Sequence, residues 1–183
     1  MALAHGLDGA HNSRSTAAEP LVAVDFAHPM LRRASGKAES VAGFFRRIEF
    51  VEADALCLPF PDGAFDLVAT AFGFRNLVNY AAGVRELHRV LAPGGWLAIL
   101  EFAEPESALV RRLFQFYFHH VLPAIGGAIS GNPGAYNYLP KSVAHFPTPK
   151  DLVDLIQGCG FSGIEYDSWT CGIVTLHTAR VAE

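Results

Sequence analysis

Two carboxylates each follow an apolar run of residues, and of all the side chains they are the best placed to bind a ligand. Asp25 ends the run Leu21–Val24, and Asp54 comes shortly after the alternating run Ile48–Glu52. A carboxylate at the carboxyl end of a strand lies where α/β sheets bind ligands, and it can accept hydrogen bonds from both hydroxyls of a ribose. Asp54 is suited to accept one from an adenine amino group. The alternatives are a helix cap for Asp25 and a plain loop residue for Asp54.

Strands that alternate with helices must position these side chains, so we predict an α/β fold with a mostly parallel sheet. The predicted strands and helices are Leu21–Val24, helix His28–Ala38, Ile48–Glu52, Phe65–Phe72, helix Tyr80–Leu91 and Trp96–Phe102. The later third adds an apolar helix over Ala108–Ile125, a shorter one over Lys150–Gln157, and the strands Phe161–Trp169 and Cys171–Val181 as an antiparallel C-terminal edge.

We expect a poorly ordered lead-in over residues 1–19 and one domain over residues 20–183, because the lead-in has no apolar periodicity. It has no signal-peptide pattern either, which predicts a cytoplasmic protein. The stretch between Arg112 and Lys141 has no Asp, Glu, Lys or Arg, but its glycines and prolines argue against a membrane span.

The charge and cysteine content exclude several classes of function. The net charge is -4 and no basic stripe occurs, so we expect no nucleic-acid partner. The 3 cysteines are widely spaced, and no Asp, Glu and His cluster has metal-ligand spacing, so we expect neither a metal site nor a disulfide framework.

Several motifs together resemble the class I, S-adenosylmethionine (SAM)-dependent methyltransferases. Beside the two acidic strand ends, these are the turn Leu58–Val68 and the helix stop Val90–Gly95. Further segments narrow the resemblance to the C-methyltransferase family of ubiquinone and menaquinone biosynthesis, the UbiE/COQ5 type. These segments are Ala71–Asn76, Leu100–Phe102, Ala135–Ser142 and Gly172–His177.

The resemblance implies SAM as cofactor and a prenylated benzoquinol or naphthoquinol as substrate, methylated at a ring carbon. By the same resemblance, Asp25 holds the ribose, Asp54 and Ala55 the adenine, and Ala71 lies beside the cofactor. Met30 covers the adenine face. Methylation of another small hydrophobic acceptor would use the same cofactor residues.

Ring methylation requires removal of a phenolic proton, and Arg75-Asn76 follows a predicted strand where the ligands should meet. An arginine can stabilise a phenolate or polarise a water that takes the proton. The alternative is that Arg75 binds a surface carboxylate and Asn76 caps the following helix.

Tyr136 and Tyr138 lie in a segment that can fold over the ring as a lid, although structural tyrosines are nearly as good an interpretation. Four histidines are conceivable bases but are more often structural: His119, His120, His145 and His177. The apolar helix over 108–125 has more apolar side chains than one buried face needs. The surplus suits a channel for a prenyl tail, a membrane surface or a second subunit.

One departure from the family stands out, because no GxGxG turn with a preceding strand occurs before Asp25. In class I enzymes the amides of that turn approach the amino-acid part of the cofactor. We therefore expect a sheet that lacks its first strand and glycine-rich turn. The explanations are a truncated or misread gene start, which we favour, a strand from another chain, or a catalytically silent subunit that no longer binds SAM.

Overall fold

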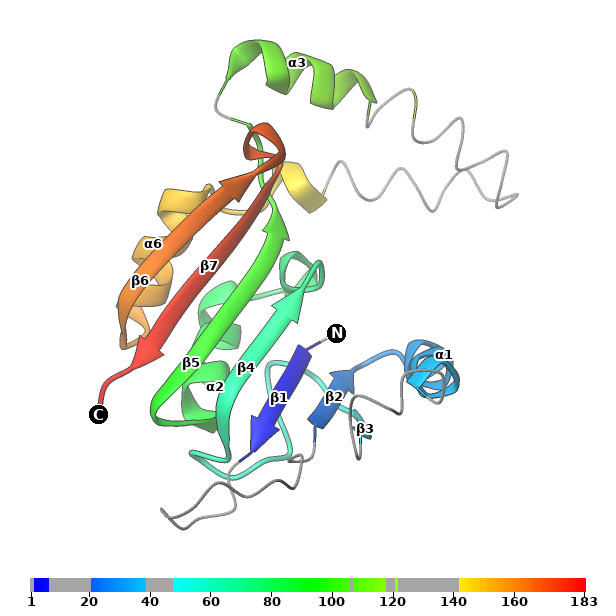
Figure 1. The fold of residues 1–183 in the computed structure, drawn as a ribbon, viewed down its shortest axis with the longest axis vertical. Helices are drawn as coiled ribbons and strands as arrows, with labels where there is room; N and C mark the ends of the chain where they lie inside the picture. The colour runs from blue at the N-terminus through cyan, green and yellow to red at the C-terminus, as the bar shows by residue number, and fades with distance from the viewer. Residues whose placement is uncertain (1, 7–20, 39–47, 106, 118–120, 122–141) are drawn as a thin grey trace.

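The computed structural model describes residues 2–6, 21–38, 48–105, 107–117, 121 and 142–183. These residues form a 7-stranded sheet in the order β3-β2-β1-β4-β5-β7-β6 (Figure 1). The strands are β1 (Ala2–Gly6), β2 (Leu21–Asp25), β3 (Ile48–Glu52), β4 (Phe65–Ala71), β5 (Leu91–Phe102), β6 (Phe161–Trp169) and β7 (Val174–Val181). The helices are α1 (His28–Ala38), α2 (Tyr80–Val90), α3 (Ala108–Phe116) and α6 (Pro149–Gly158), with single 3-10 turns η2 (Phe74–Asn76) and η4 (Thr170–Gly172).

The alternation of strands and helices produces the predicted parallel pairs. Strand β2 pairs with β3 in parallel, and β4 pairs with β5 in the same way. Helix α1 connects the first pair and α2 the second, as parallel neighbours require a crossover connection. The predicted bounds of β2, α1 and β3 agree with the structure within a residue, and the α/β fold class is confirmed.

The centre of the sheet differs from the expectation. Residues 1–19 are predicted to be irregular and the first strand to be missing, whereas Ala2–Gly6 is a strand between β2 and β4. A gap there would leave two rows of backbone N–H and C=O groups unpaired in the middle of the sheet, so even a short segment is stabilised by filling it. The prediction of an irregular lead-in is therefore wrong for residues 2–6, while residues 7–19 lie outside the described part.

Strand β1 runs antiparallel to both of its neighbours. Ala2 lies opposite Val24 and Thr70, and His5 lies opposite Leu21 and Leu67. The beginning of β1 is therefore at the carboxyl end of β2 and β4, and its last residue is at the other end.

The predicted antiparallel C-terminal edge is confirmed. Strand β7 pairs antiparallel with both β5 and β6. It begins at Val174 rather than at Cys171, because Cys171 (φ 57) and Gly172 (φ 86) turn the chain in left-handed conformations within η4. That 3-10 turn is the tight connection expected between the two strands.

Strand β5 begins earlier than predicted, at Leu91, directly after α2. The stop at Pro93-Gly94-Gly95 lies inside it. Gly94 has φ 74, and a Cβ atom at Gly95 would stand 2.8 Å from the Ala92 carbonyl oxygen. The two glycines thus allow a bend that other residues would not, and the helix ends just before it.

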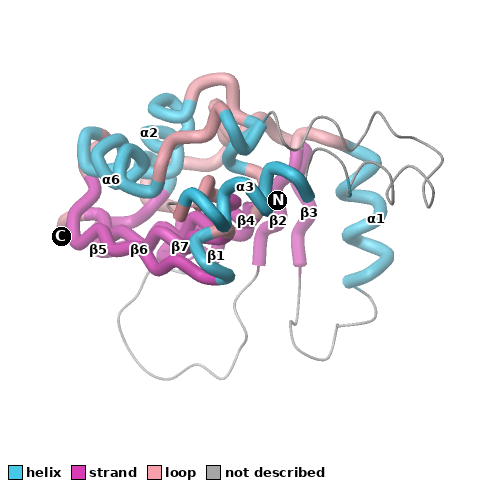
Figure 2. Tube along the Cα trace, turned by 90° about the horizontal axis from the view of Figure 1, so that it is seen from above, coloured by secondary structure: helices cyan, strands magenta, loops and turns pink. Residues whose placement is uncertain are grey.

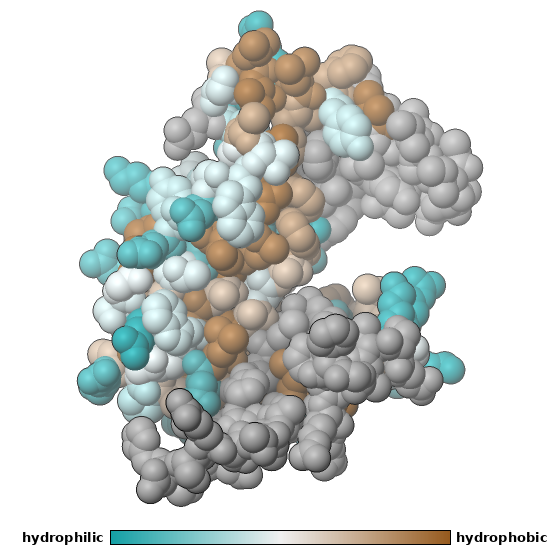
Figure 3. Space-filling view, viewed as in Figure 1, coloured by the Kyte–Doolittle hydropathy of each residue, from teal (hydrophilic) through white to brown (hydrophobic). Residues whose placement is uncertain are grey.

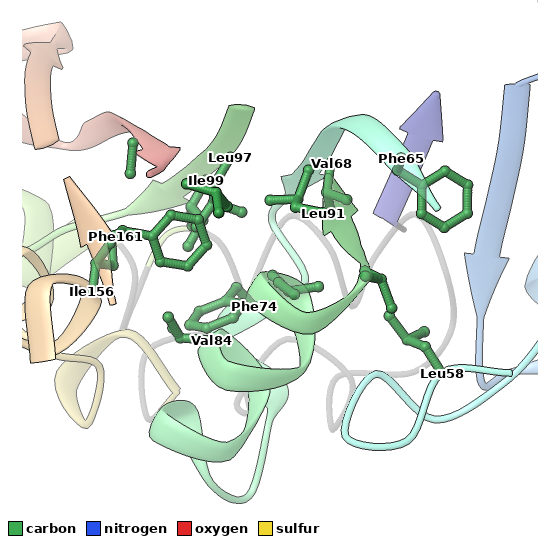
Figure 4. Packing of buried hydrophobic residues seen from close by; sticks show 14 of the residues in the cluster. Leu58, Phe65, Val68, Phe74, Val84, Leu91, Leu97, Ile99, Ile156 and Phe161 are labelled. Atoms are coloured by element: carbon green, nitrogen blue, oxygen red, sulfur yellow. The ribbon is translucent and has the colours of Figure 1, made fainter. Parts of the chain in front are cut away.

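Helices α2 and α6 cover the same face of the sheet (Figure 2). Val84 of α2 and Ile156 of α6 are fully buried in one cluster with Leu97 and Ile99 of β5 (Figure 4). Each helix has a side-chain N-cap, since Asn79 accepts a hydrogen bond from Ala82 N and Thr148 accepts one from Asp151 N. This core fixes the direction of β4 and β5, whose ends carry the candidate site.

Helix α3 extends beyond the end of β5 (Figure 1) and shows apolar side chains on the surface in Figure 3. It covers Ala108–Phe116 of the helix predicted over Ala108–Ile125. Phe114 is its buried side chain, whereas Leu109, Leu113 and Phe116 are 70%, 62% and 59% exposed. In the described part of the chain, no helix has the length and apolar character needed to span a bilayer.

Candidate functional site

The carboxyl ends of β2, β3, β4 and β5 lie at one edge of the sheet (Figure 1). We call this edge, marked by Asp25, Asp54, Ala71 and Phe102, the ligand edge. Asp25, Ala71 and Phe102 are the last residues of β2, β4 and β5, and Asp54 lies just beyond β3. The predicted cofactor residues and Arg75 are therefore on the same edge, as the strand pattern implies.

Asp25 turns the chain from β2 into α1. Its Oδ1 accepts a hydrogen bond from Ala27 N at 2.9 Å, and its main-chain oxygen accepts one from Ala53 N at 3.2 Å. Ala27 lies just before α1, and its own carbonyl accepts from Met30 N and Leu31 N. The Asp25 contact is therefore an Asx turn before the helix, and the alternative of a helix cap for Asp25 is wrong.

Asp54 and Ala55 form a tight turn after β3. Asp54 Oδ1 accepts from Leu56 N at 2.9 Å, and Cys57 N donates to the Asp54 oxygen at 3.0 Å. The Asp54 side chain is exposed and Ala55 is half-buried. The turn therefore leaves an exposed carboxylate next to the half-buried Ala55 just beyond β3.

Two apolar side chains are exposed at the junction of β2 and α1. Met30, in the first turn of α1, is 52% exposed, and Phe26 is 75% exposed. Nearby, His28 Nδ1 lies 2.8 Å from Glu52 Oε2 and joins the start of α1 to the end of β3. Phe26 and the His28–Glu52 pair were missed by sequence reasoning; an apolar residue directly after the acidic strand end was the available signal for Phe26.

The end of β4 is a sharp bend. Ala71 is exposed, and Phe72 adopts φ 54, a left-handed conformation that is uncommon for an aromatic residue. Phe72 N donates to Leu100 O at 2.9 Å, and the Phe72 ring packs against Phe102 with centroids 4.7 Å apart. The bend ends the strand and sends the chain into η2, which contains Arg75.

Arg75 is bound to a buried carboxylate. Its Nη1 donates to Glu101 Oε1 at 2.8 Å, and its backbone N donates to Glu101 Oε2 at 3.1 Å. Its Nε donates to Ser142 Oγ at 3.3 Å, and its guanidinium also donates to the carbonyl of Phe72. The alternative of a carboxylate partner is thus realised, but with a partner in the interior rather than on the surface.

Asn76 is exposed, and its backbone N donates to Gly73 O at 3.1 Å within η2. The cap of α2 is Asn79, not Asn76. The alternative role of Asn76 as the helix cap is therefore wrong, because the 3-10 turn uses three residues and the helix starts later. Asn76 remains an exposed amide next to Arg75 at the ligand edge.

The predicted lid lies outside the described residues, since Tyr136 and Tyr138 are not among them, and neither are His119 and His120. Within the described residues, His, Cys, Asp and Glu side chains form no group of three that could hold a metal ion.

His177 is buried in the middle of β7. Its Nε2 donates to Pro149 O at 3.0 Å, which links β7 to the start of α6, and its ring stacks on Tyr166. Its Nδ1 is buried and has no hydrogen-bond partner among the described residues. Burial lowers the pKa of His177, although the bond to Pro149 opposes this, so the ring is neutral at pH 7. This arrangement favours the structural interpretation of His177.

Comparison with known proteins decides the family. The model of the ubiE/COQ5 methyltransferase family matches residues 6–180. This chain belongs to that family. A demethylmenaquinone methyltransferase of Thermus thermophilus is 50% identical over 157 residues, which are 86% of this chain and 70% of the relative. One of Deinococcus radiodurans is 48% identical, with coverages of 84% and 62%.

Other ubiE/COQ5 relatives carry a broader name. A ubiquinone/menaquinone biosynthesis C-methyltransferase of Geobacter sulfurreducens is 44% identical over 87% of this chain and 62% of its own length. The chain thus spans about two thirds of the length of the relatives that it matches.

Solved structures agree on the fold expected of a ubiE/COQ5 family member. A putative methyltransferase of Bacillus halodurans superposes with a TM-score of 0.62 at 17% identity, over 90% of this chain and 84% of that one. A SAM-dependent methyltransferase of Thermotoga maritima, described as a possible histamine N-methyltransferase, gives 0.60 at 16%, over 86% and 71%. At these identities the similarity concerns the fold alone.

Sequence reasoning on this ubiE/COQ5 chain missed the partner of Arg75. Glu101 stands in the Leu100–Phe102 segment that helped to identify the family, but it was read as a motif position only. The signal that could have identified Glu101 is its place in the alternation of the strand. It is a charged residue at a position where the alternation requires an inward apolar side chain.

Proposed function

We propose that this protein methylates a ring carbon of a prenylated quinol with SAM as methyl donor, and that demethylmenaquinol is the substrate. The observation that carries the proposal is the ligand edge, where Asp25, Asp54 and Arg75 lie at or just beyond the carboxyl ends of β2, β3 and β4. The names of the relatives with 50% and 48% identity support the naphthoquinol over the benzoquinol. The reaction is proposed to take place at the cytoplasmic side of a membrane.

The residues present fit the nucleoside part of SAM. Asp25 would hold the ribose hydroxyls, and the Asp54-Ala55 turn would bind the adenine edge through a carboxylate and an amide. Met30 would cover one adenine face and Ala71 would lie beside the cofactor. When bound, SAM supplies an electrophilic methyl group on sulfur.

Arg75 and Asn76 would act on the quinol. The ring carbon becomes nucleophilic as the neighbouring phenol loses its proton, and the Arg75 guanidinium stabilises the phenolate or polarises the water that accepts the proton. Asn76 orients a ring oxygen through its amide. Tyr138 is predicted to cover the ring from outside the described part of the chain.

A second candidate, a catalytically silent subunit, is favoured by the direction of β1. Because β1 is antiparallel, Gly6 lies opposite Phe65, at the start of β4, rather than at the ligand edge. The end of β1 is therefore at the opposite edge of the sheet from Asp25, Asp54 and Arg75. The two candidates differ in whether the chain binds and uses SAM.

Ring methylation tests the first candidate. Purified chain is incubated with SAM and a short-tailed demethylnaphthoquinol, and the quinone product is measured by mass spectrometry. We expect the product to carry one added methyl group, and the variant Asp25→Asn to raise KM for SAM about tenfold, because a ribose contact to a charged group is lost. The control Asp154→Asn changes an exposed carboxylate of α6 and should leave KM unchanged.

Helix α3 is proposed to rest on the membrane that contains the prenylated quinol. Leu109, Leu113 and Phe116 expose apolar surface, and α3 carries Arg111 and Arg112 but no acidic residue. An apolar stripe with cations beside it fits an anionic bilayer surface. A second copy of this chain is the alternative occupant.

Sedimentation with phosphatidylglycerol-containing vesicles tests this surface. The double change Leu109→Glu and Leu113→Glu should lower the bound fraction at least about tenfold, since each leucine loses its transfer to the bilayer. Val78→Glu changes an exposed apolar residue before α2 and serves as control. Membrane contact would be contradicted if the double variant bound the vesicles as well as wild type does. It would also be contradicted if wild type formed a dimer that the double variant does not form.

A further inference from the structure

A buried carboxylate interrupts an apolar row on β5. Leu97, Ile99 and Glu101 alternate along the strand on the same face, and Glu101 is fully buried. A carboxylate at such a position is destabilising unless it is paired and hydrogen-bonded, and an apolar residue would fill the same row without that requirement. Stability of the core therefore gives no reason for a glutamate at this position.

The hydrogen-bond partners of Glu101 supply the reason. Three N–H groups donate to its two oxygens: Arg75 Nη1 at 2.8 Å, Arg75 backbone N at 3.1 Å and Phe102 N at 3.0 Å. Two of the three belong to Arg75, one on its side chain and one on its main chain. Glu101 thus fixes both ends of a single long residue and leaves it little rotational freedom.

The other contacts of Arg75 complete this restraint. Its guanidinium carbon lies 5.6 Å from the centre of the Phe102 ring, and the same ring packs on Phe72, whose carbonyl accepts from the guanidinium. Ser142 Oγ accepts from Nε, and the Arg75 side chain is 9% exposed. The bend at Phe72, the end of β5 and the segment at Ser142 therefore meet at one guanidinium.

We propose that Glu101 is the positioning residue of this site: it holds the Arg75 guanidinium in one orientation at the ligand edge and neutralises part of its charge. The proposal rests on the function proposed for Arg75. An arginine held in this way presents its N–H donors to a phenolate oxygen without having to reorient during the reaction. Preorganised donors lower the activation free energy for this reason.

A purely structural role would give a different result. A buried ion pair that only stabilises the fold affects unfolding, and its loss should leave the turnover number of the folded enzyme unchanged. A positioning role affects kcat, because the misplaced guanidinium fails in the transition state, while KM for SAM stays the same.

The chain offers a matched control in Glu86. Its oxygens also accept three N–H groups, from Arg89 Nε at 2.9 Å, Arg89 Nη2 at 2.7 Å and Leu58 N at 2.7 Å. This pair joins α2 to the loop before β4 and has no part in the ligand edge. Glu86→Gln therefore removes an equivalent carboxylate–arginine pair without touching Arg75.

The experiment measures kcat and KM of ring methylation for wild type, Glu101→Gln, Glu101→Asp and Glu86→Gln, each first shown to be folded by circular dichroism. We expect Glu101→Gln to lower kcat about a hundredfold, with KM for SAM unchanged, because misorientation of a catalytic group has an effect of this order. Glu101→Asp should recover part of kcat, and Glu86→Gln should keep the wild-type kcat. Equal kcat in Glu101→Gln and Glu86→Gln would overturn the proposal.

A second measurement does not depend on turnover. In nuclear magnetic resonance spectra of chain labelled with nitrogen-15, the Nη–H signals of Arg75 are assigned by their absence in Arg75→Lys, and Nη1 is the atom that donates to Glu101. They should exchange slowly in wild type and in Glu86→Gln and rapidly in Glu101→Gln. If wild type shows no methyl transfer, the proposed function fails and this exchange rate alone decides on positioning. Equal exchange in all three proteins would overturn it.

Discussion

At the scale of single residues, His177 makes the stability of the protein depend on pH. Burial lowers the pKa of the folded imidazole below its ordinary value of 6.5. The unfolded chain therefore binds a proton at a higher pH than the folded chain does. Stability is full above about pH 6.5 and is lost as the pH falls from there toward the folded pKa.

Urea unfolding between pH 7.5 and pH 5 measures this effect. We expect the unfolding midpoint of wild type to fall across this range and that of His177→Gln to fall less, because a neutral amide has no proton to gain. Identical slopes for wild type and His177→Gln would refute the contribution of His177.

The site residues that the sequence predicts are placed by the local strand pattern, whereas the one that it missed is placed by strand pairing. Asp25, Asp54 and Arg75 follow strands directly, so their position at the ligand edge is fixed by the local pattern. The partner of Arg75 is Glu101, 26 positions away, and pairing of β4 with β5 is what brings the two together. Such contacts depend on strand register, which a single sequence specifies only weakly.

At the scale of elements, β1 is the strand that the pattern did not predict. Five residues with no marked β propensity occupy the centre of the sheet because the unpaired edges of β2 and β4 stabilise any strand that fits between them. The other elements carry their own apolar period, and so α1, β3 and β6 were predictable within a residue. Tertiary context determined β1, whereas local context was enough to predict α1, β3 and β6.

Leu3→Pro tests the central position of β1. Leu3 lies opposite Ala23 of β2 and Ala69 of β4, and proline removes a backbone donor from the middle of the strand. We expect a loss of about 2 kcal/mol in the free energy of unfolding, since a buried backbone acceptor is left unpaired. Hydrogen exchange should speed up in β2 and β4 and stay unchanged in β6.

Unchanged exchange in β2 and β4 would show that β1 does not pair with them in solution. Helix α6 provides a second reference, because its amides bond within the helix and should be as protected in Leu3→Pro as in wild type.

At the scale of the whole molecule, the sheet order and the family agree with a methyltransferase, while the antiparallel direction of β1 puts its last residue, Gly6, at the edge of the sheet opposite Asp25. The central claim is that these 183 residues still transfer a methyl group. The most direct test is mass spectrometry of a demethylnaphthoquinol after incubation with the purified chain and SAM. We expect a product with one added methyl group on the ring. SAM binding without any methylated product, or no binding at millimolar SAM, would contradict it and leave the silent subunit as the function of this chain.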